Sequence, residues 1–189
     1  MSLRRLTLCL LFLAPACATT RGADWSAIQA ELAQRVALDQ EVRAKLQLGG
    51  ELDMEVAHRM EKIDRDNSAW MKTLVERHGW PTISRVGKQA SQDAWLLVQH
   101  AEVEFQEQCL PLVRAAVEAQ DADPKNLAYL EDRVNMYRGR PQRYGTQFKF
   151  GANGLEVHTL EDAARVDEWR AAVGLGTLAE YEARLRGEE

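Results

Sequence analysis

The stretch "GRPQRYGTQFKFGANG", residues 139–154, interrupts a chain whose other segments mostly have helical spacing. Its Asn153-Gly154 pair is a strong signal for a two-residue hairpin turn. With that turn, the facing apolar pairs are Phe150 with Val157 and Ala152 with Leu155. Because a two-stranded ribbon is only marginally stable alone, its apolar side must lie against helices. The stretch therefore predicts one small β-hairpin, at about 147–158, packed on a helical body.

Helical signals precede this hairpin. Apolar residues recur at helical spacing over about 25–38 and 52–78, with a break at Gly49-Gly50 between them. Gly79 is typical of the residue that follows a helix C-terminus, so it ends the second helix. The next helix is predicted over 91–120, with a kink at Pro111.

Capping signals predict the remaining helices. Asp123, an N-cap residue followed by Pro124, opens a helix that ends near residues 138–140. Two short helices near the C-terminus are predicted from capping boxes of Thr159 with Asp162 and of Thr177 with Glu180. The expected fold class is mainly α, a single helical domain over 24–189 with one small β-hairpin.

The N-terminus has the pattern of an export signal. Two arginines precede the apolar run "LTLCLLFL" at 6–13, which is too short for a membrane span of about 20 residues. "LAPAC" at 13–17 resembles the lipobox of bacterial lipoproteins, although Ala14 stands where Leu is usual. We expect a signal peptide over 1–16, lipid on Cys17 and a short linker over 17–23. The alternative is plain secretion after the small-x-small site at 14–16.

This N-terminal signal implies a cellular location and a set of partners. Lipid on Cys17 would anchor the protein to the bacterial envelope, and Ala18 favours the outer over the inner membrane. Loss of residues 1–16 leaves 22 basic against 29 acidic side chains, a net charge of −7 that disfavours nucleic acid. The expected partners are the membrane, through the lipid, and a small-molecule or envelope-protein ligand. No cofactor is expected, and the oligomeric state is open.

One thiol remains after processing. Cys9 leaves with the signal and Cys17 takes the lipid, so Cys109 has no partner for a disulfide. It lies among apolar positions of a predicted helix. We expect a small buried hydrophobe there in preference to a nucleophile.

Four short strings occur in order along the chain. They are "HGWPTISRVG" at 78–87, "QHAEVEFQ" at 99–106, "AYLEDRV" at 128–134 and "QRYGTQF" at 142–148. Together they resemble a bacterial family of uncharacterised function with GWP, QHA, AYL-x-DR and YGTQ motifs. The resemblance covers about 62–181 and implies kinship in fold without a mechanism.

The helix predicted over 91–120 carries polar side chains on its apolar face. Gln99, Glu102 and Gln106 fall between its apolar residues. An unpaired buried donor or acceptor costs about 1–3 kcal/mol, so each of these groups needs a partner. They either hold irregular backbone in place or line a polar pocket, and Gln99 is a candidate ligand contact.

His100 lies about 100° from the centre of that face. Histidine titrates near neutral pH, so His100 is a candidate general base, and the alternative is a hydrogen bonder at the helix edge. A metal site formed with Glu102 or Glu104 is disfavoured, because the i, i+2 spacing makes the side chains diverge. No HExxH or CxxC motif occurs, and we expect no metal.

Asp132 and Arg133 lie beside a predicted buried stripe. The stripe consists of Leu127, Leu130, Val134 and Tyr137. Arg133 lies at the edge of this stripe, and Asp132 lies on a face of the helix well away from it. Arg133 could present its planar fork to a carboxylate or phosphate of a ligand, or to an acidic residue inside the fold. Asp132 is the candidate acid, or the group that orients His100.

The YGTQ segment, 144–147, is the best candidate wall of a site. Gly145 permits a positive φ or a close approach of another chain segment. Tyr144 and Gln147 supply polar groups around it, and short polar turns on rigid scaffolds often contact ligands. These two residues and Trp80 complete the candidate ligand contacts.

Two functions fit these residues. The first is a lipid-anchored ligand-binding or scaffolding domain, because no nucleophile, base and acid set is recognisable. The second is a hydrolase or group-transfer enzyme in which His100 and Asp132 act on a substrate held by Arg133 and Gln147. The second hypothesis requires that these four side chains converge.

Overall fold

The computed structural model describes residues 23–47, 53–151 and 154–188. These ranges contain seven α-helices and one two-stranded antiparallel sheet, which confirms the mainly α class with a β-hairpin. The elements are α1 (Trp25–Gln47), α2 (Met54–His78), α3 (Ile83–Gln99), α4 (Val103–Glu118), α5 (Pro124–Tyr137), β1 (Phe148–Gly151), β2 (Gly154–Val157), α6 (Val166–Ala172) and α7 (Leu178–Arg186). No helix in the described ranges combines the length and the apolar character needed to cross a bilayer.

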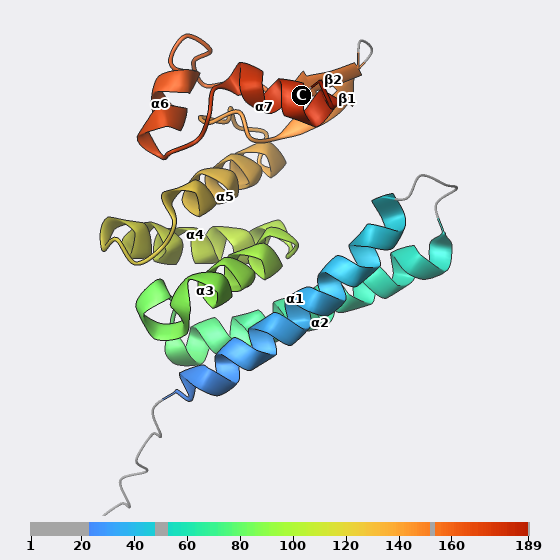
Figure 1. Ribbon diagram of the computed structural model, residues 1–189, viewed down its shortest axis with the longest axis vertical. Helices are drawn as coiled ribbons and strands as arrows, with labels where there is room; N and C mark the ends of the chain where they lie inside the picture. Colours follow the sequence, from blue (N-terminus) through green and yellow to red (C-terminus); the bar gives the residue numbers. More distant parts are fainter. Residues whose placement is uncertain (1–22, 48–52, 152–153, 189) are drawn as a thin grey trace, which may run out of the picture.

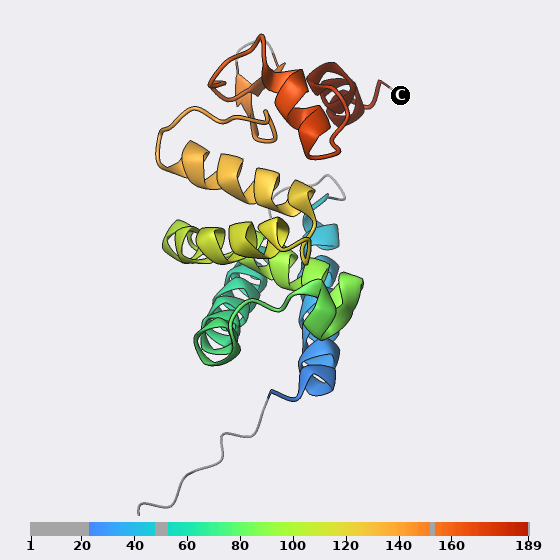
Figure 2. The same cartoon turned by 90° about the vertical axis from the view of Figure 1, so that its left-hand side faces the viewer.

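The elements stack along one long axis. Figure 1 shows α1 and α2 as a long antiparallel pair at one end, followed by α3, α4 and α5, with the hairpin, α6 and α7 at the other end. Figure 2 shows the same stack from the side. Helix α1 packs on α2 and α3, and α4 packs on α5. The core lies among α1–α5 and includes Met71, Leu97, Phe105 and Leu130. We call the part from residue 142 to residue 186 the C-terminal layer.

Helix ends follow their capping residues. The Asp24 carboxylate accepts a hydrogen bond from the Ala27 amide at 3.1 Å, and Asp53 caps α2. Gly79 has φ +74° and ends α2 as predicted. The break expected at Gly49-Gly50 lies outside the described residues.

The single helix predicted over 91–120 is wrong. Helix α3 begins earlier, at Ile83, and has a kink at Gly87, where φ is +77°. It ends at Gln99, and α4 begins at Val103 after a bend. Periodicity missed this bend because apolar positions keep nearly the same spacing on both sides of it.

Buried glutamines hold the bend between α3 and α4. The Gln106 side-chain amide donates to the carbonyls of Gln99, at 3.3 Å, and Ala101, at 2.7 Å. Gln99 and Gln106 are buried, which confirms that they face inward. Glu102 is exposed and pairs with Lys72, because the break turns it outward.

The predicted hairpin exists with a different register. Phe148 pairs with Val157 and Phe150 with Leu155, so the connecting pair is 152–153, which lies outside the described residues. Phe150 is 88% exposed, so the expected apolar face is wrong there. The shift of the turn by one residue changes which positions face each other, and it leaves Phe150 next to the last pair of the hairpin, Gly151 with Gly154.

The capping predictions for the C-terminal layer have different outcomes. Thr177 and Glu180 form the expected capping box at the start of α7. Thr159 and Asp162 open no helix, because α6 begins only at Val166 and the Asp162 carboxylate accepts from the amide of Ala164.

One carboxylate ties the C-terminal layer to the helical stack. Asp132 of α5 is fully buried and accepts hydrogen bonds from the amides of Arg143, Tyr144 and Thr146 at 2.8–3.1 Å. The expectation that Asp132 lies away from the buried face is therefore wrong, and Tyr137, expected to be buried, is 59% exposed. Helix α5 buries two faces, since α4 covers one and the 143–146 loop covers the Asp132 side.

Replacement of this carboxylate tests its structural role. We expect Asp132→Ala to lower the free energy of unfolding by about 3 kcal/mol, because it leaves buried amides without an acceptor. Asp132→Asn keeps one acceptor oxygen and should cost about half as much. Urea denaturation of both variants measures the difference, and equal stability of Asp132→Ala and wild type would contradict the role.

Candidate functional site

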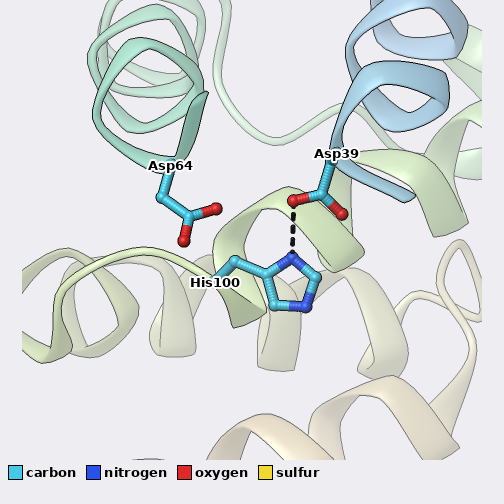
Figure 3. A group of neighbouring side chains, drawn as sticks. All are labelled: Asp39, Asp64 and His100. Carbon is cyan, nitrogen blue, oxygen red and sulfur yellow. Dashed lines mark hydrogen bonds and ion pairs between the residues drawn. The ribbon is translucent and has the colours of Figure 1, made fainter. Parts of the chain in front are cut away.

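His100 lies where three helices meet. It is the C-cap residue of α3, and its Nδ1 lies 3.0 Å from Oδ1 of Asp39 on α1. Asp64 of α2 extends toward the same point, as Figure 3 shows. The nearest available ligand atoms of the three side chains all lie within 4.8 Å of one another. We call this group the triad (Asp39, Asp64, His100).

Arg43 joins the two carboxylates of the triad. Its Nε lies 3.1 Å from Asp39 Oδ1, and its Nη2 lies 2.5 Å from Asp64 Oδ1. The side-chain amide of Gln40 donates to Oδ2 of Asp39 at 2.7 Å. Asp39 is fully buried, whereas the side chains of Arg43 and Asp64 are each 22% exposed.

The two carboxylates have opposite pKa shifts. Burial raises the pKa of Asp39, but hydrogen bonding and charge attraction from His100, with help from Gln40 and Arg43, lower it to a net value below the ordinary one. Burial raises the pKa of Asp64 and outweighs the attraction of Arg43. The Asp64 carboxylate is thus the less compensated of the two negative charges.

No local sequence pattern identifies this triad. Asp39, Asp64 and Arg43 lie on helices distant in sequence from His100, and surface-type acids on amphipathic helices carry no local signal. The metal ligands considered from sequence, Glu102 and Glu104, are exposed and pair with Lys72 and Arg138 instead.

Gln99 precedes His100 in the chain, and Arg133 of α5 contacts the backbone of Gln99. Arg133 Nη1 donates to the Gln99 carbonyl at 2.9 Å, so this guanidinium supports the end of α3. The Gln99 side-chain nitrogen and Arg133 Nε are buried without a hydrogen-bond partner among the described residues. Buried polar atoms of this kind are commonly satisfied by ordered water.

The other predicted site residues lie elsewhere. Asp132 binds loop amides, and the Gln147 side chain donates to Thr146 Oγ1 at 2.9 Å. The backbone amide of Tyr144 donates to Asp132, and Trp80, within the GWP string, is buried. The structure brings together His100, Gln99 and Arg133, and it places Asp132 and Gln147 in a second environment. Asp39, not Asp132, is the carboxylate that contacts His100.

A cavity of about 500 Å³ opens between α5 and the C-terminal layer. Ten residues line it: Lys125, Tyr129, Arg170, Gly174, Leu175, Gly176, Thr177, Glu180, Tyr181 and Arg184. A volume of this size lies in the range of small-molecule sites. Three of the lining side chains are cationic and one is anionic, so we call it the cationic pocket.

Arg170 is the central cation of this pocket. Its side chain is only 2% exposed, and it donates to the carbonyls of Gly176 at 2.6 Å and Tyr144 at 2.7 Å. No carboxylate of the described residues lies within 4.0 Å of its nitrogens. Burial lowers the pKa of Arg170, yet an arginine side chain stays protonated in proteins. This buried guanidinium is thus compensated by carbonyl dipoles and by the face of the Tyr181 ring, without a carboxylate in contact among the described residues.

Arg184 and Lys125 add charge at the rim of the pocket. Both are exposed, and neither has an ion-pair partner in the described part of the chain. The guanidinium groups of Arg184 and Arg170 lie over the Tyr181 ring at 5.0 and 5.1 Å. Glu180, one helical turn before Arg184, instead accepts from the Thr177 amide at 2.7 Å. The capping box thus engages the Glu180 carboxylate, and within the described residues no ion pair forms between it and Arg184.

The start of α7 does not itself offer amides to a ligand. Thr177 and Glu180 cap each other, and the Leu178 amide donates to Asp167 at 2.7 Å. The cations, and not the helix N-terminus, give the pocket its positive charge. Most of its lining residues lie within 170–181, at the end of the region that the family resemblance covers, where the sequence predicted no site residue.

The fold and these contacts define a mainly helical domain with a bound C-terminal layer. The chain belongs to a family of unknown function, DUF6624, whose model matches residues 26–188. This match extends beyond residues 62–181, the region that the family resemblance covers. No curated protein and no solved structure matches the chain. Family membership therefore adds no activity to the geometry.

Cys109 is a buried apolar residue, as the sequence predicts. It is fully buried in the core, and burial raises the pKa of its thiol to about 12. We expect less than one thiol equivalent of the native protein to react with a disulfide reagent within an hour at pH 8 when Cys17 carries lipid or is replaced by Ser. Full reaction in 6 M guanidinium is the control, and rapid labelling of the native protein would contradict this burial.

Proposed function

We propose that the protein is an envelope-anchored binding domain that holds an anionic small molecule in the cationic pocket. The observation that carries this proposal is Arg170, a buried guanidinium without a carboxylate partner among the described residues, on the wall of a cavity of about 500 Å³. Charge buried without a counter-ion is costly, so a site of this kind gains free energy when an anion enters.

The rim of the pocket supports the same ligand chemistry. Lys125 and Arg184 add two cations that are free to turn toward a ligand, while Tyr129 and Tyr181 give it aromatic walls. The chain as a whole has a net charge of −5, so this local excess of positive charge runs against its composition. A carboxylate or phosphate group is the ligand chemistry that matches arginine forks.

The geometry favours binding over the hydrolase hypothesis. That hypothesis needs Asp132 and Gln147 near His100, whereas Asp132 accepts from amides of the 143–146 loop and the Gln147 side chain donates to Thr146. Among the residues that the structure describes, the lining of the cationic pocket includes no histidine or cysteine that could act as a base or a nucleophile.

The proposed location in the cell envelope is supported only by the N-terminal signal sequence. The apolar run at 6–13 and Cys17 lie outside the described residues, and lipid on Cys17 is part of the proposal. In this arrangement α1 begins a few residues after the anchor. Helices α6 and α7, which contribute to the lining of the cationic pocket, lie at the opposite end of the stack from the start of α1, as Figure 1 shows. The pocket would then face away from the membrane to which the protein is attached.

Anion binding can be measured on the purified protein. We expect inorganic phosphate or succinate to raise the melting temperature, with a gain of about 2.7 kcal/mol at 100 times the dissociation constant. Glycine betaine, which carries no net charge, should have no effect. Phosphate and succinate separate a phosphate ligand from a carboxylate ligand.

Charge removal at the rim locates the binding. We expect Arg184→Gln and Lys125→Gln each to weaken anion binding about tenfold in calorimetric titration, which corresponds to about 1.4 kcal/mol. Arg186→Gln is the matched control, since it removes the same charge from the same helix outside the pocket lining. Equal loss of affinity in Arg186→Gln would show non-specific attraction and reject the pocket.

Lipidation is tested at its own residue. Cells grown with a fatty-acid analogue should label the wild-type protein and leave Cys17→Ser unlabelled, and the variant should leave the membrane fraction. Unchanged labelling and membrane association of Cys17→Ser would reject the anchor while leaving the anion site untouched.

A further inference from the structure

The triad has the composition of a metal site. It offers two carboxylate oxygens and one imidazole nitrogen from α1, from α2 and from the C-terminal end of α3. First-row divalent ions such as Mn²⁺ and Zn²⁺ bind this mixed set of oxygen and nitrogen ligands. Asp39 is fully buried and His100 is largely buried, so these are not solvated surface groups that meet by chance.

The spacing is close to what a shared ion requires. Metal–oxygen and metal–nitrogen bonds of about 2.0–2.2 Å place two adjacent ligand atoms about 3 Å apart. Asp39 Oδ1 and His100 Nδ1 are 3.0 Å apart, and the farthest pair in the triad is within 4.8 Å. Asp64 is partly exposed and is the side chain that has to move inward to complete the set, as Figure 3 shows.

A cation already occupies part of this position. Arg43 contacts one oxygen of each carboxylate, so its guanidinium compensates both negative charges in the structure. Its side chain is 22% exposed and flexible, and it can turn into solvent when another cation takes its place. A divalent ion brings twice its charge to the same two carboxylates.

The surroundings of Asp39 resemble the supporting shell of a metal ligand. The side-chain amide of Gln40 donates to Asp39 Oδ2 at 2.7 Å, which leaves Oδ1 directed at His100. Hydrogen bonds that orient a ligating carboxylate in this way are a common feature of metal sites. Asp64 Oδ2 has no hydrogen-bond partner among the described residues, so one oxygen of the second carboxylate is available.

We propose that Asp39, Asp64 and His100 bind a divalent transition-metal ion in exchange for the Arg43 guanidinium. The ion joins the three consecutive helices α1, α2 and α3. The site is independent of the proposed anion binding, because no residue of the triad lines the cationic pocket.

The test uses Mn²⁺ and Zn²⁺ on chelator-treated protein. Mn²⁺ binding is measured by the loss of the free-ion EPR signal, Zn²⁺ binding by calorimetric titration, and both by the rise in melting temperature. We expect one ion per chain, and we expect Asp64→Asn and His100→Gln each to lower the affinity at least tenfold. His100→Gln retains a hydrogen-bonding group opposite Asp39, so loss of binding there reports ligation and not only packing.

Arg43→Gln is the decisive variant. If Arg43 competes with the ion, its removal should tighten Mn²⁺ binding at least tenfold, and the ion should restore the melting temperature that the variant loses. If the cluster is only a structural ion-pair network, Arg43→Gln loses stability and no ion restores it, which overturns the proposal. Should this variant fail to fold even with the ion present, that outcome also counts against the exchange.

A matched control guards against binding by scattered surface acids. Glu76→Gln removes an exposed acid from α2, the helix that carries Asp64, and should leave the stoichiometry and affinity unchanged. Equal loss in Glu76→Gln and Asp64→Asn, or no saturable binding in wild type, would overturn the site.

Discussion

A single loop held between two buried charges organises the C-terminal half of this protein. On one side, the Asp132 carboxylate of α5 collects the amides of the 143–146 loop, and on the other side the Arg170 guanidinium of α6 binds the carbonyl of Tyr144. The opposite charges do not touch, because the peptide units lie between them and their dipoles compensate both. Gly145 makes this possible, since its φ is +61° and a Cβ there would lie 2.9 Å from the Leu178 side chain. This arrangement fixes α6 and α7 against α5, and the cationic pocket is the space that it leaves.

The same constraint explains why the positive charge of the pocket persists. Arg170 is held in place by carbonyl groups, which satisfy its donors without cancelling its charge. Glu180 is used as a helix cap and leaves Arg184 uncompensated. Structural demands on two polar side chains therefore produce a site with a net positive charge in an acidic protein. The triad shows the reverse situation, in which two acids are compensated by Arg43. The proposed cation site lies among α1, α2 and the end of α3, and the proposed anion site lies between α5 and the last two helices (Figures 1 and 3).

Much of the fold could be predicted because its signals are local. Asp123-Pro124, Gly79 and the Thr177–Glu180 capping box act within a few residues, and each appears in the structure where the sequence indicates it. The bend at residues 100–102 could not be predicted, since the Gln106 and Arg133 side chains that stabilise it come from the next two helices. The candidate site was predicted in part: His100 lies at a junction, but its carboxylate partner is on α1, 61 positions earlier in the chain.

The sequence by itself determined the helical class, several helix ends and the inward direction of Gln99, Gln106 and Cys109, because periodicity and capping act within one or two turns. Only the tertiary structure decided which charges meet. Asp132 faces backbone amides, Asp39 faces His100 and Arg170 faces carbonyl groups, and each of these pairings joins elements from separate parts of the chain. Hydrogen bonds between such elements depend on how the helices stack, and no pattern within a single helix contains that information.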